Sequence, residues 1–420
     1  MNHRHTAGLL AAAVGEAVLY EGGFSDTSRI VFAALAAVCV AGAVAWDGSR
    51  VRRLLRLPPV VVLLALGLLG VASAAWTVGF AGTALAWGAT VAAYGGVMLV
   101  AAALARAPRA TELTAAGIAG LAIVSGLVGL AGAAGLGEPF ADRLGGAWRP
   151  GGTLEYSAAL ALLEVSALPA LLAAMCAGSR RLAAAGALGG GVAASVLALS
   201  GSRAEVALAG LVCLAAVVFP RAMLGSGRMR ALGAAGVLAA AGLCAHVVAE
   251  PSTSTAPATV AAAVASPGPQ SRPARASDFW HGRLHLWAAA LETAADRPVT
   301  GSGADSFLAA SASHQQSGPV RFAHDLPLEL TVELGIGGAL LALALYATVA
   351  REVWLARRGR AFWLLGPAAV AFPLAGLIDW PWHLAGCGAV WATAVGMLAG
   401  RVRASEYGSA PIRRAIQEAR

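Results

Sequence analysis

The sequence predicts an all-α fold, a polytopic bundle of membrane-spanning helices with one large loop on its outer side. Of the 420 residues, 58% are hydrophobic and only 12% are charged, which is about half the charged fraction of a soluble domain. The mean hydropathy is +0.71. Apolar runs of about 20 residues, the length that crosses a bilayer, recur along the whole chain. No soluble catalytic domain interrupts them, so residues 1–420 are expected to form a single membrane domain.

The apolar runs predict about twelve helices. They lie near residues 7–20, 30–46, 58–75, 79–104, 115–136, 153–176, 182–200, 204–219, 231–249, 326–349, 361–378 and 384–400. The first run is short, carries Glu16 and resembles a signal peptide. Because no small-residue cleavage site follows it, we interpret it as a retained first span.

The distribution of arginine predicts the orientation of the bundle. All 30 basic residues are Arg. With the N-terminus in the cytoplasm, 21 of the 30 fall in interior segments and every interior loop is basic, as the positive-inside rule requires. Both termini are therefore expected to be cytoplasmic. No compact basic domain is present, so the chain is not expected to bind nucleic acid.

Residues 250–325 form the one long connection, and the orientation puts it outside. Its first third is rich in Ser, Thr, Ala and Pro and is typical of a linker. An amphipathic helix is predicted over about 279–297, before Pro298, and is expected to lie on the membrane or over the bundle. Its apolar positions are Phe279, Leu284, Trp287, Ala288 and Leu291. The turn-rich stretch "VTGSGADSF" follows.

The loop ends at "HDLPLELTVELGIGG", where polar residues enter an apolar segment. His324 carries an imidazole, which acts as a base near neutral pH, although a lone histidine is more often structural. Asp325 is expected to cap the following helix. Glu329 and Glu333 lie one and two turns further along the same face. They are candidate site residues, and the alternative is that they pair with an arginine inside the bundle.

Three arginines on the outer side are candidate anion ligands. Arg203 lies in a very short outer loop, where orientation requires no arginine. Arg283 lies on the predicted amphipathic helix, and Arg321 precedes His324 by three residues. A guanidinium group suits phosphate because it stays charged and donates two parallel hydrogen bonds. The alternative for each is a solvated or snorkelling arginine.

No metal or cofactor site is predicted. The chain has neither a DxD pair nor a GxxxxGK[ST] segment, so metal-dependent nucleotide-sugar chemistry is unsupported. The five cysteines lie in apolar runs and form no CxxC pair. They are expected to be small hydrophobic residues of helices.

The stretch beginning at His324 resembles the signature of the O-antigen ligase and O-antigen polymerase family. That signature is His, then Asn, Ser or Gln, nine residues, Gly, two residues, and Gly, Thr or Tyr. Here His324 is followed by Asp325, nine residues, Gly335 and Gly338, so only Asp325 departs from it. The stretch "SGSRAE" resembles the short outer loop with an arginine, and "GRLHLWAAALETAADRPVTGSGADSF" resembles the family's loop helix. The resemblance covers roughly residues 200–390, and the first half of the chain matches in hydropathy alone.

The resemblance implies a GT-C-like glycosyltransferase of the bacterial cytoplasmic membrane that needs no metal. The donor would be a glycan on undecaprenyl pyrophosphate at the outer leaflet, and the acceptor a second glycan or another envelope molecule. His324 would act as base or bind the acceptor hydroxyl, while Arg203 and Arg283 would hold the pyrophosphate. Tyr156 and Asp379 are expected near the same outer face. The resemblance does not separate a polymerase from a ligase.

Two alternatives stay open. A transporter or flippase for a lipid-linked glycan would carry charges at mid-depth in its spans. In this sequence, the ionisable residues cluster at the outer ends of spans, with Glu16 and Glu164 as exceptions, which favours a surface site. A non-catalytic scaffold of envelope assembly is the second alternative, and it would tolerate the loss of His324.

Overall fold

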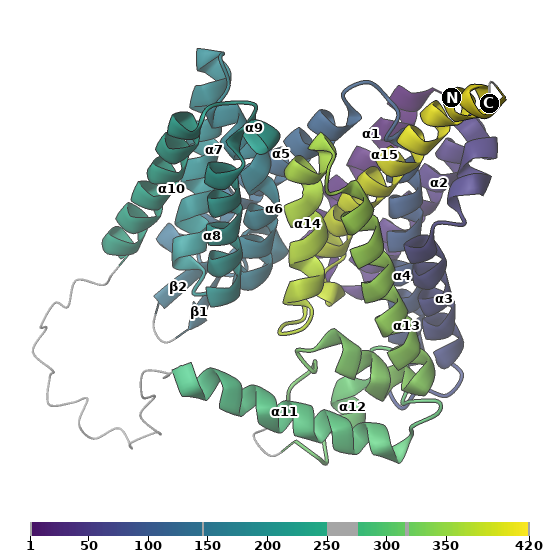
Figure 1. Cartoon of the computed structure of the whole chain (residues 1–420). Helices are drawn as coiled ribbons and strands as arrows, with labels where there is room; N and C mark the ends of the chain where they lie inside the picture. Colours follow the sequence, from purple (N-terminus) through teal and green to yellow (C-terminus); the bar gives the residue numbers. More distant parts are fainter. Residues whose placement is uncertain (1, 145–146, 250–275, 316–318, 419–420) are drawn as a thin grey trace, which may run out of the picture.

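The computed structural model describes residues 2–144, 147–249, 276–315 and 319–418, and almost all of its regular structure is helical (Figure 1). The N-terminal half contains α1 (His3–Leu19), α2 (Asp26–Leu54), α3 (Pro58–Ser73), α4 (Ala81–Leu104), α5 (Ala110–Ala131), α6 (Ser157–Met175) and α7 (Arg180–Leu199). The C-terminal half contains α8 (Arg203–Val218), α9 (Pro220–Leu224), α10 (Arg228–Ala249), α11 (Ala276–Asp296), α12 (Phe307–Ser311), α13 (Leu326–Ala356), α14 (Arg360–Ala375) and α15 (Ala385–Glu418).

Each of the twelve apolar runs forms a helix. Among the described residues, eight helical segments are long and apolar enough to cross a membrane. These begin at residues 26, 81, 110, 157, 180, 228, 326 and 385. Helices α3 and α14 are apolar but shorter. The chain is thus a polytopic helical membrane protein, and the number of twelve spans stays a prediction.

Helices α4 and α15 form the centre of the bundle. In α15, 89% of the most apolar window is buried, against 17% in the peripheral α10. Tyr94 of α4 is fully buried and donates a hydrogen bond to the carbonyl oxygen of Trp382 at 3.1 Å. Large apolar side chains such as Leu188 and Leu343 are exposed on outer helices, as expected where a helix faces lipid.

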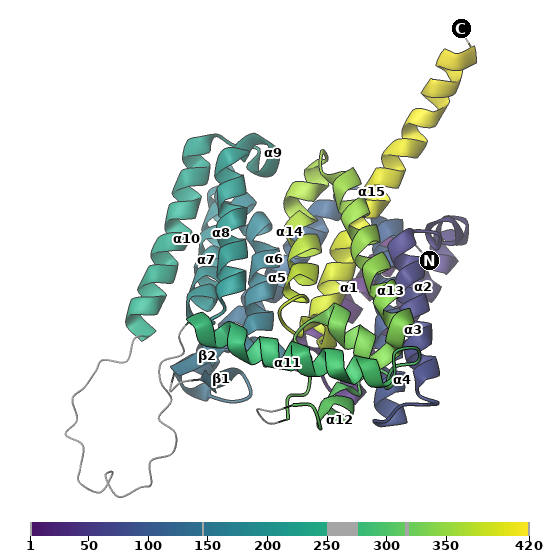
Figure 2. The ribbon, with the colours of Figure 1, turned by 60° about the horizontal axis from the view of Figure 1, so that its bottom comes forward.

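One end of the bundle carries the outer elements. Figures 1 and 2 show α11 lying across that end, with α12 beside it. A two-stranded antiparallel hairpin, β1 (Ala141–Leu144) and β2 (Ala147–Pro150), lies at the same end. The chain ends lie toward the opposite end in Figure 1. The loop that the sequence assigns to the outside is therefore the part that covers one mouth of the bundle.

Helix α11 packs on α13 through a face that carries mostly small residues. The buried side chains are Leu286, Ala289, Ala290 and Thr293. Leu284 and Leu291, two of the predicted apolar positions, are 55% and 59% exposed. Small residues let two backbones approach closely, whereas lipid accepts large apolar residues as readily as a protein core does. The side chain of Phe279 lies outside the described part of the chain.

Candidate active site

His324 is held at the mouth of α13 by an unusual backbone conformation. Its φ is 53°, in the left-handed region that few non-glycine residues occupy. The next residue, Asp325, is the N-cap of α13 and accepts a hydrogen bond from the Leu328 N–H at 2.8 Å. Pro327 follows in the first turn, where a missing N–H costs nothing. The cap and the left-handed residue together fix the backbone that carries the imidazole. Such strain recurs at functional sites.

The imidazole of His324 contacts Asp379, which follows α14. Its Nδ1 lies 3.0 Å from the Asp379 Oδ1. Tyr156, the residue before α6, donates its hydroxyl to the same carboxylate, at 3.0 Å and 2.8 Å from the two oxygens. The Trp380 N–H also donates to Asp379 at 2.9 Å. Because a carboxylate only accepts, Nδ1 is the nitrogen that donates in this contact, and Nε2 is the nitrogen that Asp379 does not engage.

Aromatic rings fix the walls around this carboxylate. Trp380 stacks on Tyr156 with ring centroids 4.4 Å apart and on Phe322 at 5.0 Å. Burial raises the pKa of Tyr156, and the charge of Asp379 raises it further, so the phenol stays protonated and remains a donor. The histidine is thus oriented by a carboxylate that two other donors, the Tyr156 hydroxyl and the Trp380 N–H, fix in place.

Arg283 of α11 lies within electrostatic reach of the same group. Burial lowers the pKa of Arg283, while Asp379, Tyr156 and Glu205 raise it again. Glu205 lies in the first turn of α8, is 3% exposed and accepts a hydrogen bond from the Ser202 hydroxyl. Arg203 begins α8 two residues before Glu205 and has an exposed side chain. The N-terminus of α8 and the N-terminal half of α11 therefore flank the His324 site.

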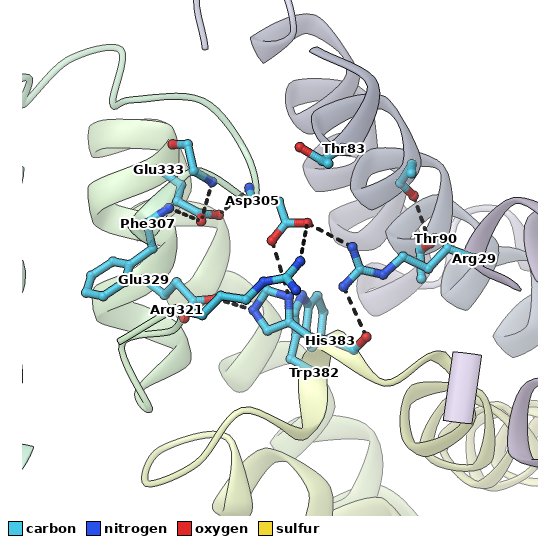
Figure 3. A network of polar contacts seen from close by, with 12 residues as sticks. Arg29, Thr83, Thr90, Asp305, Phe307, Arg321, Glu329, Glu333, Trp382 and His383 are labelled. Carbon is cyan, nitrogen blue, oxygen red and sulfur yellow. Dashed lines mark hydrogen bonds and ion pairs between the residues drawn. The ribbon is translucent and has the colours of Figure 1, made fainter. Parts of the chain in front are cut away.

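Glu329 and Glu333 bind partners other than arginine among the described residues. Glu333 accepts three backbone hydrogen bonds, from Asp305 at 3.0 Å, Ser306 at 3.0 Å and Phe307 at 3.1 Å, and so fixes the start of α12 (Figure 3). Glu329 accepts from His383 and from the Ala323 N–H at 2.8 Å. The alternative of an ion pair with a bundle arginine is therefore wrong for both.

A buried arginine of α2 binds Asp305 in the turn that precedes α12. Arg29 is 1% exposed, and its Nη1 lies 2.8 Å from the Asp305 Oδ2 (Figure 3). Its Nη2 donates to the His383 carbonyl at 3.2 Å. Burial raises the pKa of Asp305, but His383 and Arg29 outweigh it, so that the pKa lies below its usual range. Arg321, with its side chain 49% exposed, lies 3.9 Å from the same Oδ2.

The two signature glycines have a structural role. Gly335 interrupts α13 with a φ of 60°, and a Cβ there would lie 2.3 Å from the Val299 carbonyl oxygen. The carbonyl groups freed by this kink bind the outer loop. Ser302 N–H donates to Val332 at 3.0 Å and Gly303 N–H donates to Glu333 at 2.7 Å. A Cβ on Gly338 would collide with the Leu330 carbonyl oxygen at 2.1 Å. Gly335 therefore lets the turn after α11 dock on α13, and Gly338 lets α13 itself adopt the kink.

The structure brings together some of the expected residues and separates others. His324, Asp379 and Tyr156 form one hydrogen-bonded group, and Arg283 lies near it. Asp325 caps a helix, while Glu329 and Glu333 support the loop. Arg321 contacts Phe24 and Phe322 through their ring faces, at 5.0 Å and 5.1 Å.

Arg29 and Asp305 are residues that sequence analysis misses. Arg29 had a usable signal, since it is an arginine at the outer end of a span, where orientation requires none. Asp305 had none, because aspartate is common in turn-rich stretches.

Among the described residues, no group of three or more His, Cys, Asp or Glu side chains is arranged to hold a metal ion. The site's own groups supply a base at His324 and a cation at Arg283. Its two hydrogen-bond donors are the Tyr156 hydroxyl and the Trp380 N–H. Such a set can take a proton from a hydroxyl and neutralise an anionic leaving group.

Comparison of the chain with known protein families finds a match to one family model. The model of the family described as O-antigen ligase matches residues 166–343, which include Arg203, Arg283 and His324. Tyr156 and Asp379 lie on either side of the matched part. No match to the chain is found among curated proteins.

Proposed function

Because residues 166–343 match the model of the O-antigen ligase family, we propose that this chain is a glycosyltransferase that moves a glycan from undecaprenyl pyrophosphate to an acceptor hydroxyl. The reaction would take place on the outer face of the bacterial cytoplasmic membrane, in a GT-C-like bundle. The observation that carries the proposal is the hydrogen bond from His324 Nδ1 to Asp379, because it leaves Nε2 as the ring nitrogen available to an acceptor hydroxyl.

The proposed chemistry needs one base and one anion site. Nε2 of His324 takes the proton from the acceptor hydroxyl as the oxygen attacks the anomeric carbon of the donor. The bond from that carbon to the pyrophosphate oxygen breaks, and undecaprenyl pyrophosphate leaves with the electron pair. Asp379 stabilises the imidazolium that forms and keeps the ring in one tautomer, as a carboxylate does in a catalytic triad.

Arg283 and Arg203 are proposed to hold the pyrophosphate. They come from α11 and α8, whose N-terminal parts flank the His324 site. A leaving group with two phosphates accepts bidentate hydrogen bonds from guanidinium groups, and this neutralises its charge without a metal. Arg203 is exposed, so it is free to turn toward a donor that arrives in the membrane plane.

The acceptor decides the type of transferase. A second lipid-linked glycan would make the chain a polymerase, and another envelope molecule would make it a ligase. Nothing in the arrangement around His324 selects one of them.

The test measures release of undecaprenyl pyrophosphate from a lipid-linked oligosaccharide by the purified full chain in nanodiscs, with EDTA present throughout. Candidate acceptors are added, and the glycan product is identified by mass. Wild type is compared with His324→Ala, Arg283→Ala and Arg203→Ala. We expect turnover to fall by about 100-fold or more in His324→Ala, the usual contribution of a general base. The arginine variants should also lose turnover, while their Tm stays close to that of wild type.

Arg297→Ala is a matched control, since Arg297 is an exposed arginine directly after α11. It should keep wild-type turnover. Equal turnover in His324→Ala and wild type would rule out the assigned base. If wild type itself transfers no glycan with any acceptor but moves the lipid-linked glycan across liposomes, the flippase alternative replaces the transferase.

A further inference from the structure

A second charged site lies at the end of the bundle opposite the His324 site. Five arginines line a cavity of about 160 Å³ there. They are Arg50, Arg53 and Arg56 from the end of α2 and the turn after it, Arg106 from the turn after α4, and Arg403 from α15. Only Leu54 and Leu57 complete the lining. We call this cavity the arginine pocket.

Arg50 is built into the wall of the arginine pocket. It is 6% exposed, and its Nη2 donates to the Ala102 carbonyl of α4 at 3.1 Å. Its buried Nε has no hydrogen-bond partner among the described residues. A buried guanidinium with a donor left over costs free energy, unless an acceptor enters the cavity.

The carboxylates described near the arginine pocket do not pair with the guanidinium groups of its three arginines from α2 and the following turn. Glu352 of α13 accepts from Arg403 at 2.8 Å, but it also accepts from Arg351 at 2.6 Å. Asp47 accepts from the Arg50 backbone N–H and from the Ser49 hydroxyl, so it contacts no guanidinium of the pocket. Among the described residues, Arg50, Arg53 and Arg56 have no carboxylate within ion-pair distance.

The general bias of arginine toward one side of a membrane does not account for this arrangement. That bias fills loops with solvated, separate arginines. Here three segments far apart in the sequence direct arginines at one cavity, where like charges repel one another. An anion with several acceptor oxygens removes the repulsion and satisfies the guanidinium forks at once.

We propose that the arginine pocket binds a phosphate group. The orientation proposed above puts it at the cytoplasmic face, where two sources offer that chemistry: a phosphate or pyrophosphate in solution, and the headgroup of an acidic phospholipid. The proposal does not depend on the transferase assignment, because it uses none of the residues at the His324 site.

The test uses the full chain in nanodiscs and two probes. In the first arm, inorganic pyrophosphate is titrated into nanodiscs of neutral phosphatidylcholine at constant ionic strength, and the shift in Tm is followed. In the second arm, phosphatidylglycerol is mixed into the nanodiscs, and the bound lipid is counted by native mass spectrometry. A shift in the first arm identifies a soluble ligand, and retention in the second identifies a lipid headgroup.

Arg53→Gln/Arg56→Gln is the informative variant, because both side chains are exposed and their loss leaves the fold intact. Arg180→Gln/Arg181→Gln is the matched control, with two exposed arginines removed from another loop at the same end. We expect the binding of whichever probe binds to weaken about tenfold or more in the first variant. The control should bind as wild type does. The proposal is overturned if neither probe binds wild type, if the pocket variant binds equally well, or if both variants lose binding equally.

Discussion

The role of Asp379 is the clearest case in which one residue controls another. His324 has two nitrogens, and only the Asp379 contact decides which one carries the proton. Tyr156 and the Trp380 N–H hold the carboxylate in place from other directions. Asp379 is therefore a positioning residue, and its effect should show in turnover rather than in donor binding.

We predict that Asp379→Asn lowers turnover by about 100-fold and changes the KM for the lipid donor little, since an amide can present its N–H to Nδ1 and favour the wrong tautomer. Steady-state release of undecaprenyl pyrophosphate measures both parameters. Tyr156→Phe is the control, because it removes one donor and leaves the His324 contact in place; a loss of a few fold is expected. A variant Asp379→Asn with wild-type turnover would contradict this role.

Asp325 is the one departure from the family signature, and its environment explains what the departure costs. Burial raises the pKa of Asp325 above its usual range, the N–H of Leu328 lowers it, and Glu329 raises it again. A raised pKa means that the folded chain disfavours the ionised form. The cost is present at pH values above the folded pKa, and it disappears as the pH falls through that value.

Asp325→Asn is therefore expected to raise the Tm at pH 7, because asparagine keeps the N-cap acceptor without the buried charge. The gain over wild type should shrink as the pH falls from 7 toward 4, because protonation of Asp325 removes its buried charge. Asp325→Ala should lie below Asp325→Asn by about 1 kcal/mol at every pH, the value of a cap. Thermal unfolding in detergent across this pH range checks the sign. A gain that grows on acidification would refute the argument.

At the scale of elements, the helices were predictable and their mutual contacts were not. Hydropathy alone located a helix for each of the twelve apolar runs, because length and apolar content suffice for that. Asp379 lies 55 residues from its partner His324, and Arg29 lies 276 residues from Asp305, so no local pattern indicates either pair. The signature glycines were recognised as a pattern, but the kink at Gly335 explains them only in three dimensions.

Helix α11 shows that periodicity can predict a helix without predicting which of its faces packs on the bundle. In a soluble protein, the face with the largest apolar residues would be buried. In this chain, the face with Ala289 and Ala290 packs on α13, and Leu284 and Leu291 face outward. Exposing these two leucines carries no hydrophobic penalty where they face membrane lipid, because lipid tails are as apolar as leucine.

Ala290→Leu should therefore reduce transfer more than Leu291→Ala does. Ala290 is fully buried, and three extra carbon atoms there overpack the interface with α13, at a cost of about 1–3 kcal/mol. The displacement carries Arg283 away from Asp379, so kcat/KM for the donor should fall about tenfold or more. Leu291→Ala removes a side chain that is 59% exposed and should leave kcat/KM unchanged. The reverse order of effects would mean that the face with Leu284 and Leu291 is the one that packs on the bundle.

At the scale of the whole molecule, the two ends of the bundle have different charge chemistry. The end with α11 has its ionisable groups paired across elements, as in the contacts of Arg29 with Asp305 and of His324 with Asp379. The opposite end has arginines in excess, and several of them converge on the arginine pocket. Arginine in interior loops orients a bundle during insertion, so this asymmetry makes the orientation testable.

We predict that the end with α11 faces outward. In a background without the five native cysteines, Arg203→Cys and Ser313→Cys place one exposed thiol each at the α11 end, and Arg358→Cys places one at the other end. A membrane-impermeant maleimide should label the first two in intact spheroplasts and label the third only after permeabilisation. Labelling in the opposite order would put the His324 site in the cytoplasm. A lipid-linked donor at the outer leaflet would then be out of its reach, and the proposed reaction would fail together with the orientation.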